Sequence, residues 1–273
     1  MEVLSTSSIA MYILPYMSVG SRGKTAGVPL LGIVQAILYR VKTGCQWRHL
    51  PMKAFFGNTG YRWGSVYHHF HSWIKDGSWQ HAFVMLLKNH PRLIDLSSAQ
   101  LDFSHTPAKR GGDAVGYQGR KRCKTTNGAV LSDNRGTPVA FATPRSGQHN
   151  DIFEIELVFR EILAILTQAG IDIHGIFLNA DAAFDTELVR SICAELGIEA
   201  NIPVNPRNGD PENRDEYFDD ELYNRRTVIE RTFAWLDGFK GLILRYETKL
   251  KHWISMNIIG FIIIFIRLIL KSK

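Results

Sequence analysis

The sequence predicts an α/β fold in which a mixed β-sheet flanked by helices follows a small helical region. Two observations carry this expectation. Apolar residues recur at helical spacing in the first hundred residues, whereas from about residue 98 the chain alternates between strand-like and helix-like segments. The order of these later segments is three strands, a helix, a strand, a helix, a strand and a final helix. Antiparallel strands followed by strand–helix alternation are typical of a mixed sheet covered by helices, and the ribonuclease-H-like fold has this order. We therefore expect a helical domain over residues 1–96 and a ribonuclease-H-like domain over residues 97–273.

Charge and composition narrow the class of protein. The 273-residue chain carries a net charge of +6, which favours polyanionic partners, nucleic acid first. Its hydrophobic fraction of 45% excludes widespread disorder. The three cysteines (Cys45, Cys123 and Cys193) form no CxxC pair, so neither a disulfide framework nor a zinc site is expected and a reducing cytosol fits best. The N-terminus opens with Glu2 and lacks the basic start of a secretory signal.

Two helices are predicted in the helical domain. The first, in "PLLGIVQAILYRVKTG", has one apolar face and ends at Gly44, a natural helix stop. The second, in "YRWGSVYHHFHSWIKDG", ends at Gly77 and has an expected inward stripe of Trp63, Val66, Phe70 and Trp73 or Ile74. Its other positions carry Arg62, Lys75, His68, His69 and His71. Two helices around a tight turn, the second of them basic, suggest a helix-turn-helix module with residues 61–76 in the major groove. An ordinary helical bundle with solvated histidines is the alternative.

The ribonuclease-H-like domain is expected to begin with the strand "SAQLDFSH". A glycine-rich basic loop, "TPAKRGGDAVGYQGRKRCK", and a hairpin, "TTNGAVLSDNRGTPVAFATP", follow. The helix after them should have Asp151 at its N-cap and Glu154 three residues on, as in a capping box. The remaining segments are the strand "IDIHGIFLNA", the helix "DTELVRSICAELG", the strand "IEANIPV", the polar loop "NPRNGDPENRDEYFDD" and the helix "ELYNRRTVIERTFAWLDGFKG".

The segment 253–270, "WISMNIIGFIIIFIRLIL", is long and apolar enough to cross a membrane. Arg267 interrupts it, as do Ser255, Asn257 and Gly260. We therefore expect a buried C-terminal helix and no membrane partner, with membrane association as the competing interpretation.

Two aspartates follow from the predicted sheet as candidate metal ligands. Asp102 lies on the first strand and Asp181 at the end of the fourth, and these strands are neighbours in a ribonuclease-H-like sheet. Hard divalent cations take oxygen ligands, and two-metal catalysis on phosphodiesters holds its ions about 3.5–4 Å apart. The alternative roles are structural: Asp102 could bind backbone, and Asp181 could cap a helix, although Asp185 is better placed to do so.

Glu230 is the third candidate acid. On a continuous helix it shares a face with Tyr223 and Arg226, beside an apolar stripe that would seat the helix on the sheet. That stripe consists of Leu222, Ile229, Phe233 and Leu236. Arg226 could keep the carboxylate ionised or contact a phosphate. In the alternative interpretation, Arg226 and Glu230 form only a surface ion pair of small value.

These motifs resemble those of DDE-type bacterial insertion-sequence transposases, with the large insertion-sequence-five family as the nearest group. The resemblance runs from about residue 28 to the end of the chain and is most specific around Glu230. It rests on "ILYRVKTGCQWRHLP", "DFSHTPAKRGGDAVGYQGRKRCKTTN", "SGQHNDIF", "NADAAFD" and "YNRRTVIERTFAWLDGFKGLILRYET". The family's lysine seven residues after the glutamate is replaced here by Asp237, and the nearest lysine is Lys240. The first twenty or so residues do not clearly match the family's opening helix.

The resemblance implies an enzyme that cleaves and joins DNA at the ends of its own element. Asp102, Asp181 and Glu230 would be its catalytic acids and would bind Mg²⁺, with Mn²⁺ as an alternative. DNA contacts would come from Tyr223, Arg226, Lys240, Arg62, His68 and His69 and from the basic run of Lys109, Arg110, Arg120, Lys121, Arg122 and Lys124. That run could also be only a solvated loop.

Pairing two DNA ends implies a homo-oligomer on DNA, in a bacterial cytoplasm at the nucleoid. Two other functions stay open: a nuclease on the same fold that lacks strand transfer, and an inactive or domesticated DNA-binding protein.

Overall fold

The computed structural model describes residues 2–19, 27–208 and 217–272. Its first part is helical, as predicted. The helices of this part are α1 (Thr6–Tyr12), α2 (Leu30–Thr43), α3 (Met52–Phe56), α4 (Trp63–Lys75) and α5 (Ser78–Asn89). α2 ends where Gly44 adopts a left-handed conformation (φ 68°) and its N–H bonds the carbonyl of Arg40.

Two details of the helical region differ from the sequence prediction. The connection between α2 and α4 is not a tight turn, because it contains α3 and the short 3₁₀ helix η2 (Trp47–His49). Trp63 is 42% exposed and so does not belong to the inward stripe, which consists of Val66, Phe70 and Trp73. The first residue of a helix has no preceding turn to cover it, which explains why helical spacing misplaced Trp63.

Seven strands in the described part of the chain form one mixed sheet. The sheet order is β2-β3-β1-β6-β7, and β4 and β5 also pair with β3. β1 is antiparallel to β3 and parallel to β6, and β6 is parallel to β7. The bounds are β1 (Ser98–Pro107), β2 (Gly116–Gln118), β3 (Cys123–Asp133), β4 (Pro138–Phe141), β5 (Arg145–Ser146), β6 (Phe177–Asn179) and β7 (Glu199–Asn201).

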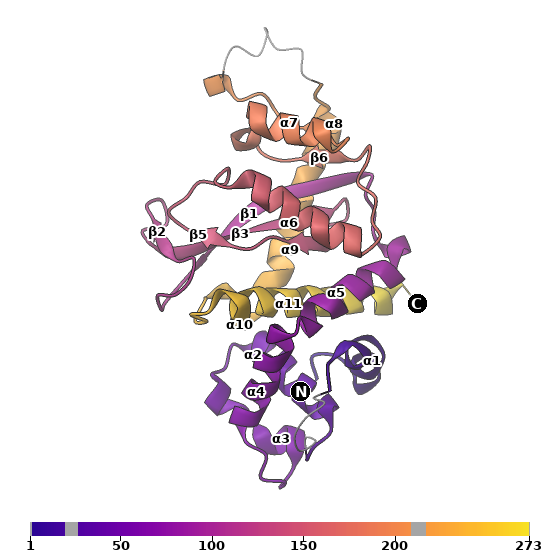
Figure 1. The fold of residues 1–273 in the computed structure, drawn as a ribbon, viewed down its shortest axis with the longest axis vertical. Helices are drawn as coiled ribbons and strands as arrows, with labels where there is room; N and C mark the ends of the chain where they lie inside the picture. Colours follow the sequence, from indigo (N-terminus) through magenta and orange to yellow (C-terminus); the bar gives the residue numbers. More distant parts are fainter. Residues whose placement is uncertain (1, 20–26, 209–216, 273) are drawn as a thin grey trace.

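Helices cover both faces of this sheet. The helices after the opening strands are α6 (Ile155–Gln168), α7 (Glu187–Glu195), α8 (Asp220–Asn224), α9 (Val228–Asp237), α10 (Lys240–Ile243) and α11 (Leu250–Lys271). In Figure 1, α6 crosses the near face and α9 runs behind the sheet. The side chains agree, since Leu101 and Leu131 face α6 while Ser104 and Val130 face α9 and α11. The predicted mixed sheet with flanking helices is therefore confirmed.

α11 lies between the N-terminal helices and the sheet, with α5 alongside it (Figure 1). It is long and apolar enough to cross a membrane, yet 78% of its most apolar window is buried inside the protein. Fully buried side chains such as Phe261, Ile262 and Phe265 join the same hydrophobic core as Trp73 and Leu101. The expected buried C-terminal helix is thus what the structure contains.

Several boundaries of the catalytic part differ from expectation. The predicted basic loop contains β2, which forms a hairpin with β3 through residues 119–122. The helix predicted to start near Asp151 is α6, whose N-cap is Glu154 in a left-handed conformation (φ 55°) and makes no side-chain cap. Asp151 instead accepts a hydrogen bond from Asn127 Nδ2 at 2.6 Å. The capping box was therefore a wrong prediction.

Two further predicted segments need comment. Thr186, not Asp185, caps α7, because the buried carboxylate of Asp185 binds Arg190 at 2.8 Å and the backbone N–H of Asn205. The predicted polar loop over residues 205–220 includes residues 209–216, which lie outside the described part of the chain.

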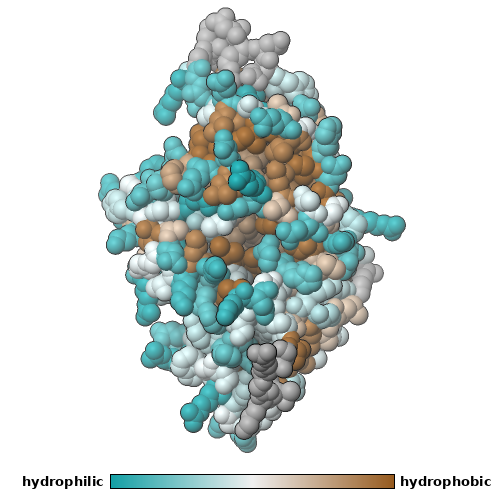
Figure 2. Space-filling model, viewed as in Figure 1, coloured by the Kyte–Doolittle hydropathy of each residue, from teal (hydrophilic) through white to brown (hydrophobic). Residues whose placement is uncertain are grey.

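Apolar residues also gather on the surface of the upper half of the molecule in Figure 2, where α6 and α7 lie. Leu157 of α6 and Leu188 of α7 are among the exposed large hydrophobic residues.

Candidate active site

Asp102 and Asp181 lie at the same end of two neighbouring parallel strands. β6 pairs with β1 only from Ser98 to Gln100, so Asp102 lies two residues beyond the last pair. Asp181 likewise lies two residues beyond Asn179, the last residue of β6 and the partner of Gln100. The register of two short strands therefore brings the two carboxylates to one open edge of the sheet.

Burial and charge perturb Asp102. Its pKa is raised from 3.8 to about 6, above all because the side chain is buried, while the Phe103 N–H and the Arg226 charge oppose the shift. The negative charge of Asp181 raises the pKa further, so the two carboxylates are close enough to repel each other. A buried carboxylate beside a second one is a group that a cation would stabilise.

Arg226 is the cation that approaches Asp102 in this structure. Its Nη1 lies 3.9 Å from Asp102 Oδ2, and its guanidinium lies over the ring of Tyr223 at 5.6 Å. Arg226 belongs to the 3₁₀ turn η7 (Arg225–Thr227), which separates α8 from α9. The single continuous helix predicted here is therefore broken at the arginine.

Glu230 does not join the two aspartates in this structure. It is exposed on the first turn of α9, whereas Ile229, Thr232 and Leu236 of the same helix are buried. Within the described residues Arg226 pairs with Asp102, and the surface pair of Arg226 with Glu230 that was the alternative interpretation is not formed. Glu230 lies four residues, about one helical turn, beyond Arg226.

Two of the side chains expected to bind a hard divalent cation lie together here. Asp102 and Asp181 provide the carboxylate oxygens that Mg²⁺ prefers. Within the described ranges, no group of three acidic, histidine or cysteine side chains is arranged to hold a metal ion. Asp181 also has the structural role considered for it, since its Oδ1 accepts the N–H of Ala183 at 2.9 Å and caps the short helix η4 (Ala182–Phe184).

Apart from Tyr223 and Arg226, the predicted DNA-contacting residues lie in three places. In the first, the β2–β3 turn, Arg120, Lys121, Arg122 and Lys124 are exposed, as are Lys109 and Arg110 at the end of β1. Lys121 Nζ reaches the carbonyl of His105 at 3.1 Å. The turn thus lies over the end of β1 that follows Asp102.

The second place is the N-terminal end of α10, where Lys240 is exposed. The pKa of Lys42 on α2 is lowered by burial and by the charges of Arg267 and Lys240. Lys42 Nζ donates to the carbonyl of Gly238 at 2.5 Å. Three cations from α2, α10 and α11 therefore meet at the C-terminal end of α9, although Asp237 stands in place of the family's lysine.

The third place is α4. Arg62 and His68 are exposed, whereas His69 is half-buried at 5.5 Å from the ring of Trp73, and its pKa is lowered by burial and by His68. His71 is exposed as well, and its Nδ1 lies 3.1 Å from Nε2 of the buried His252.

Sequence reasoning missed three buried amides beneath the site. Gln100, Asn179 and Asn201 lie on β1, β6 and β7 and are fully buried. The signal was present, because polar residues interrupt the apolar strand segments "SAQLDF", "IFLNA" and "IEANI".

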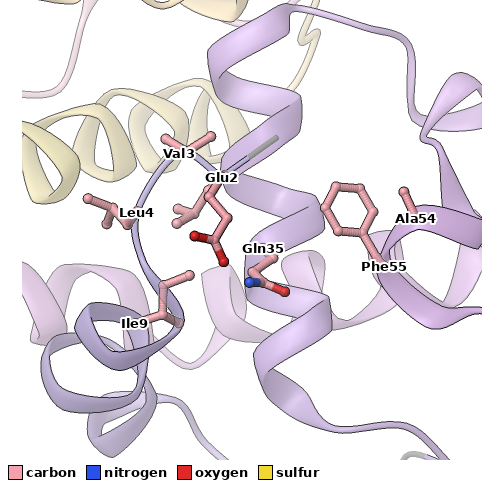
Figure 3. A pocket seen from close by; sticks show the side chains of 8 residues that line it. Glu2, Val3, Leu4, Ile9, Gln35, Ala54 and Phe55 are labelled. Atoms are coloured by element: carbon pink, nitrogen blue, oxygen red, sulfur yellow. The ribbon is translucent and has the colours of Figure 1, made fainter.

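A hollow elsewhere in the molecule shares no residue with this site. It lies between the N-terminal segment, α2 and α3, where Glu2 and Gln35 point toward one another (Figure 3).

A ribonuclease-H-like sheet that brings aspartates from two neighbouring strands to one edge defines the class of fold. The comparisons with known families then identify the chain. The family described as "Transposase DDE domain" matches residues 91–266, and the family described as "Putative transposase of IS4/5 family" matches residues 9–83. The chain therefore belongs to the DDE transposase family, and the resemblance to the insertion-sequence-five group is confirmed.

A comparison with solved structures matches this chain to a chain of the "Mos1 transposase paired-end complex with left transposon end". The two chains share 11% identity with a TM-score of 0.30, and the similarity covers 87% of this chain and 79% of that one. No curated protein gives a significant match.

Proposed function

We propose that this protein is an active DDE transposase that cleaves and joins DNA at the ends of an insertion sequence. The observation that carries the proposal is the meeting of Asp102 and Asp181 at one sheet edge, with Arg226 3.9 Å from Asp102. Asp102, Asp181 and Glu230 would hold the divalent cations, Mg²⁺ or Mn²⁺. When bound, these ions supply an activated water and neutralise charge on the phosphate oxygens.

The chain's own residues have separate roles in this proposal. β1 and the end of β6 hold the two aspartates on a rigid sheet, so that their oxygens keep a fixed separation. Arg226 neutralises Asp102 before DNA arrives and is close enough to contact a phosphate at the same edge. Glu230 would complete the site by a rearrangement of the α8–α9 junction at η7, because its side chain is exposed on the first turn of α9.

DNA binding would use the three basic surfaces described above. The β2–β3 turn and the cluster around Lys240 would contact the phosphate backbone, which gives affinity without reading sequence. Arg62, His68 and the exposed side of α4 would read the terminal repeats. A homo-oligomer would pair the two ends in the cytoplasm, at the nucleoid.

A cleavage and strand-transfer assay tests the proposal. DNA carrying the element's ends is incubated with Mg²⁺ and either the native chain or Asp181→Asn. We expect cleaved and joined products from the native chain only. Cleaved products without joined ones would indicate a nuclease, and DNA binding without any products would indicate an inactive relic.

A further inference from the structure

A ladder of buried amides runs across the three parallel strands directly beneath the two aspartates. Gln100, Asn179 and Asn201 are register partners on β1, β6 and β7. Asn179 Nδ2 donates to Gln100 Oε1 at 2.9 Å, and Asn201 Nδ2 donates to Asn179 Oδ1 at 2.7 Å. The three side chains are fully buried, where an apolar residue would be the usual choice in a parallel sheet.

The ladder also holds the segment that enters α8. Asn179 Nδ2 donates to the carbonyl of Leu222 at 3.2 Å, and Asn201 Nδ2 donates to the carbonyl of Asp219 at 3.1 Å. In return, the N–H of Asp219 donates to Asn201 Oδ1 at 2.8 Å. Asp219 then caps α8 by accepting the N–H of Leu222 at 2.8 Å. The sheet and the start of α8 are therefore joined by side-chain amides from two neighbouring strands.

These contacts connect the elements that carry the site residues. Gln100 and Asn179 each precede an aspartate by two residues, Gln100 within β1 and Asn179 at the end of β6. The clamped residues Asp219 and Leu222 precede Tyr223, and the chain continues through Arg226 to Glu230. One hydrogen-bonded network thus touches the two strands with the aspartates and the helical segment with the arginine and the glutamate.

We infer that Gln100, Asn179 and Asn201 are positioning residues of the metal site, which fix the α8–α9 segment relative to Asp102 and Asp181. This inference rests on the proposed function. Because buried amides are costly unless every bond is made, the ladder favours one register of α8 on the sheet. A shift of that register would move Arg226 away from Asp102. It would also take Glu230 out of reach of the two aspartates when η7 rearranges. Outer partners of metal ligands typically change metal affinity 10- to 100-fold when removed.

The far end of the ladder provides a matched control. Gln100 Nε2 donates to Ser98 Oγ at 2.9 Å, and Ser98 Oγ donates to Asn134 Oδ1 at 2.9 Å. Ser98 is as fully buried as the amides, but its bonds lead away from α8. Ser98→Ala therefore removes buried hydrogen bonds from the same network without releasing the helical segment.

The test compares Asn179→Leu and Asn201→Ala with Ser98→Ala in the full-length protein without DNA. Mn²⁺ affinity is measured by electron paramagnetic resonance, and backbone amide exchange is followed over residues 217–237. We expect both amide variants to bind Mn²⁺ at least 10-fold more weakly and to exchange faster over this segment. Ser98→Ala should bind Mn²⁺ like the native chain. If Asn179→Leu does not fold, Asn201→Ala at the outer strand decides the question.

Native Mn²⁺ affinity in a folded amide variant would overturn the inference, as would an equal loss in Ser98→Ala. Asp102→Asn separates this result from failure of the proposed function. If Asp102→Asn binds Mn²⁺ as tightly as the native chain, the carboxylate site itself is wrong, whatever the amide variants do.

Discussion

At the scale of single residues, we expect the ionised carboxylate of Asp102 to lower the stability of the protein at neutral pH when no metal is bound. Its pKa is about 6 in the folded state against an ordinary 3.8, so ionisation above pH 6 disfavours the folded state. The side chain is 27% exposed, and solvent screening reduces the effect to about 1–2 kcal/mol. We therefore expect Asp102→Asn to be more stable by that amount at pH 7.5 in EDTA, and no more stable at pH 4, where both side chains are neutral. Urea unfolding at the two pH values measures this, and a destabilised variant at pH 7.5 would contradict it.

The buried His252 gives the opposite pH dependence. Burial, the neighbouring His71 at 3.1 Å and Lys249 lower its pKa to about 4. Since an unfolded histidine takes up a proton near pH 6.5, the stability that His252 contributes is lost as the pH falls from about 6.5 to 4. The variant His252→Phe keeps the packing on Tyr67 and Phe70. As the pH falls from about 6.5 to 4, we expect its free energy of unfolding to decrease by about 1–2 kcal/mol less than that of the native chain. The exposed His68→Gln variant is the control and should keep the native pH dependence.

At the scale of elements, α11 should act as a core helix and not as a membrane anchor. Phe265 is fully buried in the core, whereas Leu270 of the same helix is 44% exposed. Truncating a buried phenylalanine to alanine lowers the free energy of unfolding by about 3–5 kcal/mol. Truncating an exposed leucine to alanine lowers it by well under about 1 kcal/mol. We expect Phe265→Ala to lower the free energy of unfolding by that larger amount and Leu270→Ala to leave it nearly unchanged. Equal, small effects in chemical denaturation would mean that α11 does not pack as described.

The same elements show why the sequence predicted the fold better than its details. Long periodic segments such as α2, α4 and β1 were found because each has enough apolar residues on one face to fix its type. β2 was missed because three residues in a glycine-rich basic segment carry no period, and only pairing with β3 makes them a strand. Asp151 satisfied the local rule for an N-cap, but a tertiary hydrogen bond from Asn127 took its side chain. Local rules cannot anticipate such competition.

The candidate site was predictable to a similar extent. Asp102 and Asp181 were placed correctly because strand order alone brings their strands together. The exposed position of Glu230 was not predictable, since it depends on the break at η7, where the helical period used for Tyr223, Arg226 and Glu230 does not hold. The amide ladder was missed for a related reason: its register is a property of three strands and appears in no single one.

At the scale of the whole molecule, three cations of a chain with a net charge of +6 lie together where the N-terminal helices, α9 and α11 meet. Lys42 comes from α2, Lys240 from α10 and Arg267 from α11. Burial and the charges of Arg267 and Lys240 lower the pKa of Lys42. Like charges held this close together are relieved by an anion, and a DNA phosphate at the C-terminal end of α9 would supply one. We therefore expect this cluster to contact the DNA backbone.

Salt dependence provides the measurement. Each phosphate contact contributes about 0.9 to the slope of log affinity against log salt concentration. The double variant Lys42→Gln, Lys240→Gln should therefore lower the slope by about 2 and weaken binding to specific and unrelated duplexes alike, because phosphate contacts carry no sequence information. Lys88→Gln, which removes an exposed charge from α5, is the control and should keep the native slope. An unchanged slope in a folded double variant would exclude this end of α9 from the DNA path and leave the β2–β3 turn and α4 as the remaining basic surfaces.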